Sequence, residues 1–482
     1  MYLGIDVGTS SLKAVLSDTN GKIIETASVN YAISLPHDGW TEQNPDDWYH
    51  AEIKAIKQLG NRFDLSKIQG VSFCGQMHGL VLLDKNDHVI RPAILWNDNR
   101  TVAECAYLNN VIGKKRLIEY TNNIAFTGFT APKLLWVAKH EPALFKCINK
   151  IMLPKDYAAY KMSEVFATDF SDASGTLYLD VKNKQWSKPM LKILKINQNQ
   201  LPKLFESYQV VGNVSKKFAK LTGMSTNTKV IIGGGDQAVG AVGTGTVENN
   251  QLSISLGTSG VIFAASKDFK KVSSGAMHSF CHATGQYHIM GVMLSAAGAF
   301  DWWVKDVLKT KNFKLINNTI DYQKWNDILF LPYLSGERSP INNPFARAEL
   351  HKLSLLHTQA DISKAIIEGI NFGLLDCLNS IQQLGIKSKS ARVIGGGANF
   401  DTWLQILADI LNLNINTINT TEGGALGAII LAMVGCGRFK NVSTACKVII
   451  KNTKIFKPNA ALHQKYLQKF RAWKKLYLTL YQ

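Results

Sequence analysis

Short apolar runs alternate along the chain with longer segments whose apolar residues recur every three or four positions, a pattern typical of α/β proteins. The runs predict buried strands at 2–5, 12–17, 22–27, 68–73, 230–232, 251–256, 261–265 and 393–394. The periodic segments predict helices at 44–59, 130–136, 362–384, 403–411 and 461–481. In the last helix the spacing of Tyr466, Phe470, Trp473 and Tyr477 indicates a face that docks onto the body of the protein.

A strand, a Gly-Thr-Ser turn and a second strand occur twice. The first copy lies at 5–16 and the second at 251–265. A third strand that ends in glycines lies at 393–399. We therefore predict a duplicated fold whose halves approach phosphate groups from opposite sides. Two unrelated hairpins that share a common turn are the alternative.

The stretch 230–240 combines a β-branched strand, three glycines and an acid. Asp236 follows Gly235 at the point where the strand passes into a helix of small residues at 237–242. A carboxylate there is held by rigid backbone beside open space, as a catalytic base requires. An Asp that only caps the following helix fits the same position.

The first turn also carries candidate chemistry. Asp6 precedes Gly8, Thr9 and Ser10, and Lys13 follows two residues beyond that turn. An acid beside hydroxyls and backbone N–H groups suits a metal ion and a phosphate, with Lys13 as a counter-charge. A plain hairpin connection is the simpler interpretation.

Other polar clusters follow predicted strands. Gly75 and Gly79 bracket Gln76, Met77 and His78, an arrangement suited to a polyhydroxylated ligand, although a lone His is more often structural. The segment 94–100 is a polar cluster at the end of another strand, and Lys133 is either solvated or turned inward. We expect loops near the cleft at 153–157 and 168–175, with acids that serve equally well as helix caps.

Composition and charge narrow the class of protein. The 482 residues exceed what one core holds, and 46% are hydrophobic, as in ordinary globular proteins. No apolar run is long enough for a membrane span, and the basic start of a signal peptide is absent. The seven scattered cysteines favour a reducing, cytoplasmic setting. The net charge of +18 is spread over the whole length outside any nucleic-acid motif, so we expect no nucleic-acid partner and no membrane partner.

Four motifs in this order resemble the FGGY family of carbohydrate kinases. They are 6–9, 233–236, 257–260 and 395–398, and segments 129–136 and 331–340 also look like family signatures. The resemblance runs from residue 1 to about 434. It implies two actin-like, ribonuclease-H-like α/β domains with an ATP cleft between them. We place them at 1–245 for the sugar and 246–440 for the nucleotide, followed by a helical extension at 441–482.

The resemblance also implies roles for individual residues. Asp236 is implied to be the general base, and Asp6 to act with Mg²⁺ as the metal ligand. Gln76, Met77, His78 and Gln237 fall at the implied sugar site. The ATP phosphates are implied to lie against Gly8, Thr9, Ser10, Lys13, Gly257 and Thr258, and the adenosine part against Gly396, Gly397 and Asn399. By analogy with such kinases, we expect a homodimer.

Segments 74–79, 94–100 and 153–157 are most similar to the family members that phosphorylate D-xylulose, which implies that substrate. Gln237 stands where those members more often carry Asn, and Ser339 where Thr is usual. A kinase for ribulose, gluconate or glycerol is therefore the alternative. A non-catalytic ATP-dependent switch on the same fold is a second alternative.

Overall fold

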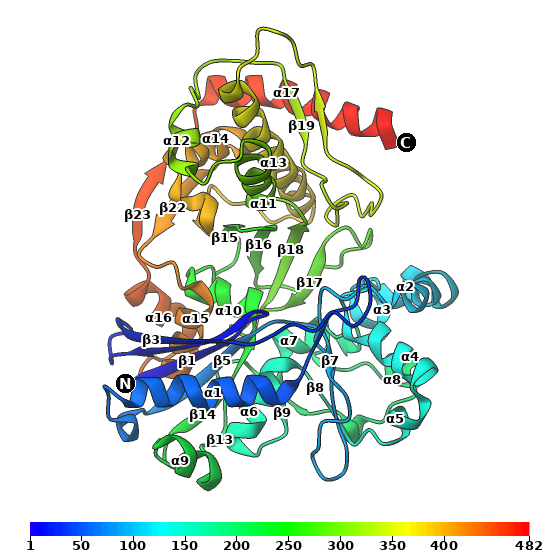
Figure 1. Cartoon of the computed structure of the whole chain (residues 1–482), viewed down its shortest axis with the longest axis vertical. Helices are drawn as coiled ribbons and strands as arrows, with labels where there is room; N and C mark the ends of the chain where they lie inside the picture. Colours follow the sequence, from blue (N-terminus) through cyan, green and yellow to red (C-terminus); the bar gives the residue numbers. More distant parts are fainter. Residues whose placement is uncertain (482) are drawn as a thin grey trace.

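Two mixed β-sheets, one in each half of the chain, form the framework of the computed structural model, which describes residues 1–481 (Figure 1). The first sheet has six strands in the order β13-β14-β5-β1-β2-β3. Their bounds are β1 Tyr2–Val7, β2 Ser11–Ser17, β3 Ile23–Asn30, β5 Gly70–Gly75, β13 Val210–Asn213 and β14 Lys229–Gly235.

The second sheet has seven strands in the order β17-β18-β16-β15-β21-β22-β23. Their bounds are β15 Leu252–Leu256, β16 Gly260–Ser266, β17 His278–Cys281, β18 Tyr287–Met293, β21 Ser390–Ile394, β22 Asn414–Ile418 and β23 Asn452–Phe456. Five two-stranded sheets complete the strands: β4 Glu42–Gln43 with β7 Ala93–Ile94, β6 Val81–Leu83 with β8 Lys150–Met152, β9 Ala167–Asp169 with β12 Lys203–Phe205, β10 Leu179–Asp180 with β11 Gln185–Trp186, and β19 Leu329–Leu331 with β20 Glu349–His351.

The two large sheets share one topology. In the first, β1 and β2 form an antiparallel hairpin that β3 extends, and β5 and β14 join β1 as parallel strands. In the second, β15, β16 and β18 repeat the antiparallel part, and β21 and β22 repeat the parallel part. The predicted duplication is therefore confirmed, and the two Gly-Thr-Ser turns occupy equivalent hairpins.

Helices cover both sheets. Those of the first half are α1 Pro45–Gly60, α2 Val102–Ala106, α3 Lys114–Thr121, α4 Thr130–His140, α5 Pro142–Lys146, α6 Pro154–Ser163, α7 Phe170–Ser174, α8 Lys188–Leu194, α9 Lys216–Thr222 and α10 Asp236–Gly243. Those of the second half are α11 Ala297–Trp302, α12 Phe313–Asn318, α13 Gln359–Gln383, α14 Asp401–Leu411, α15 Gly423–Gly435, α16 Val442–Ile449 and α17 Ala460–Tyr481. Short 3₁₀ and π segments lie at η1 Leu65–Lys67, η2 Tyr107–Gly113, η3 Gln198–Gln200, η4 Trp303–Val307 and η5 Gly396–Asn399.

Helices α10 and α15 pack together and connect the halves. A Cβ atom added at Gly427 of α15 would lie 1.9 Å from the Val239 carbonyl oxygen of α10, and one at Gly243 would lie 1.8 Å from the Gly423 oxygen. Backbones approach this closely only where side chains are absent. Although α15 comes late in the sequence, it packs against β1 and β5 of the first sheet, as the orange helix beside the blue strands in Figure 1 shows.

The prediction of loops at 153–157 and 168–175 was wrong, because both segments contain regular secondary structure. Residues 154–163 form α6, and 168–175 contain the end of β9 and all of α7. Their polar residues form a buried cluster, in which the Lys155 ammonium lies 3.1 Å from Asp169 and 3.7 Å from Asp172. Asp169 also caps α7 by accepting the Ser171 N–H. A cluster of paired charges looks like an exposed loop in the sequence, although it is fully buried.

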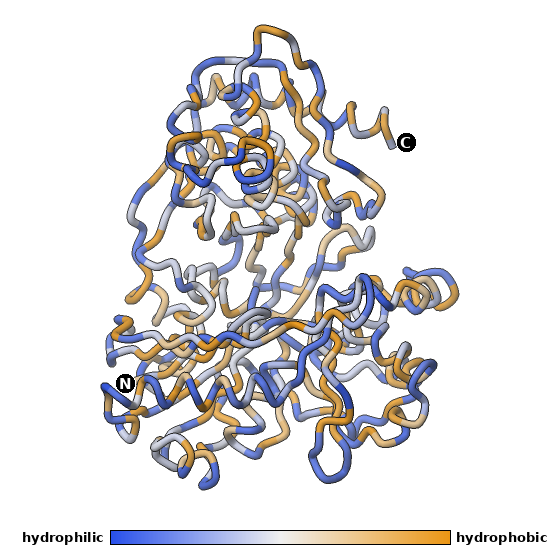
Figure 2. Tube along the Cα trace, viewed as in Figure 1, coloured by the Kyte–Doolittle hydropathy of each residue, from blue (hydrophilic) through white to orange (hydrophobic). Residues whose placement is uncertain are grey.

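The long helices agree with their patterns. Ile366, Ile370, Leu374, Leu378 and Ile381 of α13 are all buried, and so are the four aromatic residues predicted to dock α17. Trp473 of α17 donates from its indole nitrogen to the Phe330 carbonyl oxygen at 2.7 Å. Figure 2 shows polar and apolar segments alternating through both lobes. Within residues 1–481, no helix combines the length and the apolar character that crossing a membrane needs.

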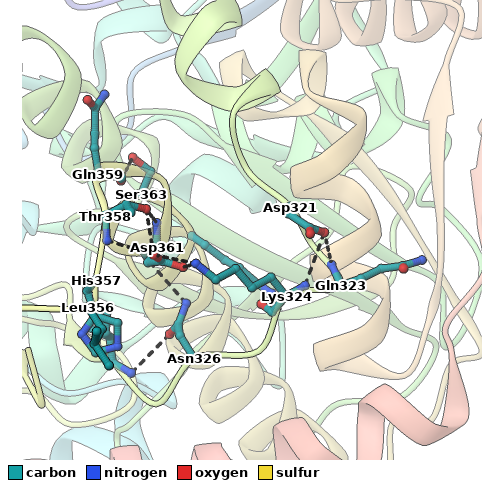
Figure 3. Close-up of polar contacts among 12 residues, drawn as sticks. Asp321, Gln323, Lys324, Asn326, Leu356, His357, Thr358, Gln359, Asp361 and Ser363 are labelled. Carbon is teal, nitrogen blue, oxygen red and sulfur yellow. Dashed lines mark hydrogen bonds and ion pairs between the residues drawn. The ribbon is translucent and has the colours of Figure 1, made fainter. Parts of the chain in front are cut away.

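A charged cap fixes the start of α13 (Figure 3). The Asp361 carboxylate accepts the Thr358 hydroxyl at 2.7 Å and the Thr358 N–H at 2.9 Å, and it pairs with Lys324 at 2.8 Å. Burial raises the pKa of Asp361, but the hydrogen bonds from Lys324 and Thr358 outweigh it and lower the pKa to about 2. The ionised carboxylate therefore connects the loop at 321–326 to the helix.

We expect Asp361→Asn to lower the free energy of unfolding at pH 7 by about 1–2 kcal/mol, because charge-assisted hydrogen bonds are lost. A lowered folded-state pKa means that this stability is complete above the ordinary carboxyl pKa near 4 and disappears as the pH falls toward 2. Urea denaturation at pH 7 and at pH 3 measures both effects. The exposed Asp306, changed to Asn, is the control; an equal loss in both variants would contradict the prediction.

Candidate active site

Two carboxyl groups meet in a cleft that the lobes share. A cavity of about 180 Å³ is lined from the first half by Asp6, Cys74, Asp236 and Gln237 and from the second half by Ser253, Ile394 and Gly424, among others. Asp6 stands near the end of β1 and Asp236 at the first position of α10. A larger cavity of about 560 Å³ lies beside β13 and contains none of the predicted site residues. The sequence predictions therefore single out the smaller cavity.

Glycines in β14 deliver Asp236 to the cleft. Gly233 has a φ of +71°, and a Cβ atom there would lie 1.8 Å from the Phe73 carbonyl oxygen of β5. The pairing of β14 with β5 shifts register between Ile231 and Gly234, so the strand bulges at this point. The bulge requires glycine, and it directs the following residues toward the cleft.

The cleft raises the pKa of both acids. Burial, followed by the charge of Asp6, raises the pKa of Asp236 to about 7, although hydrogen bonds from Gln237 oppose the shift. Burial also raises the pKa of Asp6 to about 6, against a hydrogen bond with Cys74 and the charge of Lys13. A carboxyl group with a pKa near 7 exchanges a proton at neutral pH, as a general base does.

Four side chains from outside the turn hold the first Gly-Thr-Ser turn. The hydroxyl of Tyr31 donates to the Gly8 carbonyl oxygen, and the Gln43 amide donates to the Thr9 carbonyl oxygen at 2.7 Å. The Thr9 hydroxyl donates to Gln76 at 3.2 Å and accepts from the Trp96 indole N–H at 3.0 Å. The turn is therefore a preorganised element, and the exposed Ser10 stands at its tip.

The second turn is held by backbone groups of its own lobe. The N–H groups of Ala297 and Gly298 donate to the carbonyl oxygens of Gly257 and Thr258 at 2.8 and 3.1 Å. The Thr258 side chain remains exposed. A Cβ atom at Gly397 would lie 2.8 Å from the Leu256 side chain, so the glycine segment after β21 packs directly on the strand before this turn.

The remaining predicted nucleotide residues differ in accessibility. Gly396 and Asn399 are exposed, and a Cβ atom at Gly396 would meet no atom within 4 Å. The Lys13 ammonium pairs with Glu422 at 2.7 Å, at the turn that precedes α15. Lys13 therefore already has an acidic partner, which the sequence interpretation did not include.

His78 is held in one orientation. Its φ is +70°, its ring stacks on Phe129 with centroids 4.7 Å apart, and Nδ1 lies 2.7 Å from the Gly175 carbonyl oxygen. A carbonyl only accepts, so Nδ1 carries the proton and Nε2 is left as an acceptor. Burial, followed by the Lys133 charge, lowers the pKa of His78 to about 3 and keeps the ring neutral.

The neighbours of His78 are buried. Lys133 is turned inward and donates to the His78 and Gly128 carbonyl oxygens at 2.8 and 2.7 Å. Met77 is 5% exposed, and Cβ atoms added at Gly175 or Gly235 would touch it at 2.9 Å. Met77 therefore packs between the backbone that bears His78's partner and the backbone before Asp236. The three predicted sugar contacts thus have different surroundings. Gln76 supports the Thr9 turn, Met77 packs against backbone, and His78 has Nε2 without a hydrogen-bond partner among residues 1–481.

Sequence reasoning missed Tyr31, Gln43 and Glu422 as contributors to this site. None belongs to a glycine motif, and each acts across a distance in the chain that no local spacing reveals. Trp96 was found only as part of the polar segment at 94–100. Its position after a short strand was the available signal, and its contact with Thr9 is a tertiary one.

The comparisons with known proteins agree with this geometry. The models of the N-terminal and C-terminal domains of the FGGY family of carbohydrate kinases match residues 1–243 and 252–436. The chain belongs to that family. It is 40% identical to a xylulose kinase of Escherichia coli strain K12, over 100% of this chain and 99% of the relative.

Two solved structures extend the comparison. A xylulose kinase from Brucella ovis superposes with a TM-score of 0.94 at 35% identity, covering 99% of both chains. A gluconate kinase from Lactobacillus acidophilus also superposes with a TM-score of 0.94, at 26% identity, covering 99% of this chain and 98% of its own. The prediction of two actin-like α/β domains is confirmed, and use of ATP follows from family membership.

Gln76 was predicted to contact the sugar, but in the structure it accepts the Thr9 hydroxyl, and kinetics can distinguish the two roles. If Gln76 supports the Thr9 turn, Gln76→Leu should raise the KM for ATP about tenfold, because a turn that loses a buried hydrogen bond of about 1.4 kcal/mol binds phosphates less well. The KM for the sugar should change less than about threefold. Steady-state kinetics measures both constants, and Gln69→Leu, at the other end of β1, is the control. A larger effect on the sugar would restore the predicted sugar contact.

Proposed function

We propose that this protein transfers the γ-phosphate of ATP to the 5-hydroxyl of D-xylulose. The observation that supports this most directly is the pair Asp6 and Asp236, which line one cleft and have elevated pKa values. The full-length similarity to xylulose kinases supports D-xylulose as the acceptor.

In this mechanism Asp236 is the general base. Its carboxylate accepts the proton of the sugar hydroxyl while the hydroxyl oxygen attacks the γ-phosphorus and ADP leaves. The backbone on both sides of Asp236 holds the carboxylate in place, since the Gly235 N–H donates a hydrogen bond to the Ser171 hydroxyl and α10 packs on α15. Such positioning is the main task of a protein that catalyses phosphoryl transfer.

The phosphates would lie between the two Gly-Thr-Ser turns. Gly8, Thr9 and Ser10 approach from the first lobe, and Gly257 and Thr258 from the second. Backbone N–H groups and hydroxyls at such turns stabilise phosphate oxygens. Gly396, Gly397 and Asn399 lie beside the second turn, where the adenosine part would bind. Lys13 would reach the phosphates only by exchanging its Glu422 partner.

Asp6 is the residue that would hold Mg²⁺. No cluster of three or more acidic, His or Cys side chains that suits a metal occurs within residues 1–481. Mg²⁺ commonly uses one or two carboxylates together with phosphate oxygens and water, so a single Asp beside the phosphate turn fits its needs. When bound, the ion neutralises charge on the phosphates.

The sugar would lie between Asp236 and His78. The neutral His78 ring presents Nε2 as an acceptor for a sugar hydroxyl, and Gln237 adds an amide beside the base. Closure of the lobes would exclude water, which competes with the sugar as phosphate acceptor. We further propose the division 1–245, 246–440 and 441–482, in which the last segment adds β23 to the second sheet. Homodimerisation and a cytoplasmic location remain predictions.

Gluconate is the second candidate acceptor, since a gluconate kinase has the same fold at 26% identity. Gln237 stands where Asn is more usual at the implied sugar site, so the preference among acceptor sugars is tested directly. ADP release by the purified protein with Mg-ATP should be fast with D-xylulose and at least about tenfold slower with D-ribulose, L-ribulose, gluconate or glycerol. Preference for another sugar would reassign the acceptor. Sugar-independent hydrolysis alone would support the non-catalytic switch.

Asp236→Asn should lower kcat by roughly 100-fold or more, in line with the contribution of a general base. The fold should persist, because Asn is isosteric and the β14 bulge is unchanged. Steady-state ADP release with the preferred sugar, and circular dichroism, measure the two properties. The exposed Asp401, changed to Asn, is the control. A variant within a few-fold of the unmodified enzyme would remove Asp236 from this role.

A further inference from the structure

The segment 331–340 resembles a family signature, yet the mechanism above gives it no task. Backbone bonds attach it to β18. The Glu337 carboxyl accepts the N–H groups of Leu294 and Arg338 at 2.8 and 2.7 Å, and the Ser339 N–H donates to the Val292 carbonyl oxygen at 3.0 Å. Both N–H groups bind the same oxygen, Oε1. Within the described part of the chain, Oε2 of Glu337 is buried without a hydrogen-bond partner, and neither oxygen forms an ion pair with the guanidinium of Arg338.

The Arg338 guanidinium projects toward the first lobe. Its central carbon lies 5.8 Å from the centre of the Phe126 ring, and that ring lies 5.4 Å from Phe129. Phe129 in turn stacks on His78. Phe126 also contacts His278 of β17, edge to face at 5.2 Å. A row of aromatic rings, Phe126 and Phe129, therefore lies between Arg338 and the ring of His78.

Arg338 has no acidic partner. Across residues 1–481 its side chain forms no hydrogen bond and no ion pair, although the residue is half-buried. Burial lowers the pKa of Arg338, and burial of Glu337 raises the pKa of that carboxyl to about 8, so the nearest acid is largely neutral at pH 7. A half-buried guanidinium that has no hydrogen-bond partner among residues 1–481 needs a ligand or water for its five N–H donors.

Arg338 is electrostatically coupled to the two histidines beside its aromatic neighbours. It contributes to the lowered pKa of His78 and of His278, whereas the groups that shift the pKa of Asp236 do not include it. The reacting hydroxyl must lie at Asp236. Through the rings of Phe126 and Phe129, Arg338 is on the same side as His78, at the end of the proposed acceptor site remote from Asp236.

We propose that Arg338 is a specificity-determining residue that binds the end of the acceptor remote from the phosphorylated hydroxyl, and that its planar fork gives this end affinity for a carboxylate. The proposal rests on the proposed sugar-kinase function. In a neutral sugar the fork donates to carbonyl and hydroxyl oxygens. In a sugar acid of the same length it pairs with the carboxylate through two parallel hydrogen bonds. Five-carbon aldonates are then ligands of the same site.

The test compares two five-carbon probes, the anion D-xylonate and the neutral polyol xylitol, in binding measured by calorimetry at pH 7. The unmodified protein should bind D-xylonate more tightly than xylitol. Arg338→Gln should lower the affinity for D-xylonate about 10- to 100-fold, because a charge-assisted hydrogen bond is lost. The affinity for xylitol should fall less than about threefold. Arg338→Lys keeps the charge without the planar fork, so its affinity for D-xylonate should lie between those of the unmodified protein and Arg338→Gln.

Controls separate this effect from misfolding and from general anion binding. Arg347→Gln removes an exposed guanidinium of the same loop, one that donates only to the Pro344 and Ala346 carbonyl oxygens, and should leave both affinities unchanged. Acetate at equal concentration should not compete, and the melting temperature of Arg338→Gln should match that of the unmodified protein.

Two outcomes would overturn the proposal. Equal weakening of both probes would show that Arg338 supports the fold, and absence of D-xylonate binding would show that the guanidinium is only hydrated. Either result can occur while D-xylulose is still phosphorylated, so it is distinct from a failure of the proposed function. Phosphorylation of D-xylulose by Arg338→Gln with raised KM and a kcat within a few-fold would agree with a binding role.

Discussion

The contact between α10 and α15 is the constraint on which the rest of the structure depends. Carbonyl oxygens of one helix lie where side chains of the other would begin, at Gly243 and Gly427. This contact places a helix from the second half of the sequence against the first sheet. It also brings Gly424, at the start of α15, beside the Asp6 carboxylate, where a Cβ atom would lie 3.1 Å from the nearer oxygen. Larger residues at Gly243 or Gly427 would push α10 and α15 apart and so move Asp236, at the start of α10, away from Asp6.

The electrostatics of the cleft follow from that packing. Removing water from around Asp6 and Asp236 raises the pKa of each. The charge of Asp6 adds to the shift of Asp236, and the charge of Glu422 adds to that of Asp6. The same closeness brings Asp6 and Asp236 of the first half and Ile394 of the second half to one small cavity. A duplicated fold therefore yields two similar Gly-Thr-Ser hairpins, while only the first half supplies the acids that line the cavity. The second half contributes Arg338, which contacts Phe126 of the first half.

Much of this was visible in the sequence. The strands, the docking face of α17 and the glycine turns follow from periodicity and from residues with special backbone freedom, which are local properties. The buried Lys155 cluster was mistaken for loops, because charged residues suggest solvent unless their partners are known. The supports of the Thr9 turn, Tyr31 and Gln43, and the Glu422 partner of Lys13, come from distant segments. Contacts of this kind have no signature within a single stretch of sequence.

The central claim is that a buried Asp236 of elevated pKa takes the proton of the acceptor. The pH dependence of kcat/KM for D-xylulose tests it most directly, because this ratio reports ionisation in the free enzyme. A base whose pKa lies near 7 must lose its proton to act, so kcat/KM should rise tenfold per pH unit below about 7 and level off above it. A ratio that stays flat from pH 5.5 to 8.5 would contradict the account.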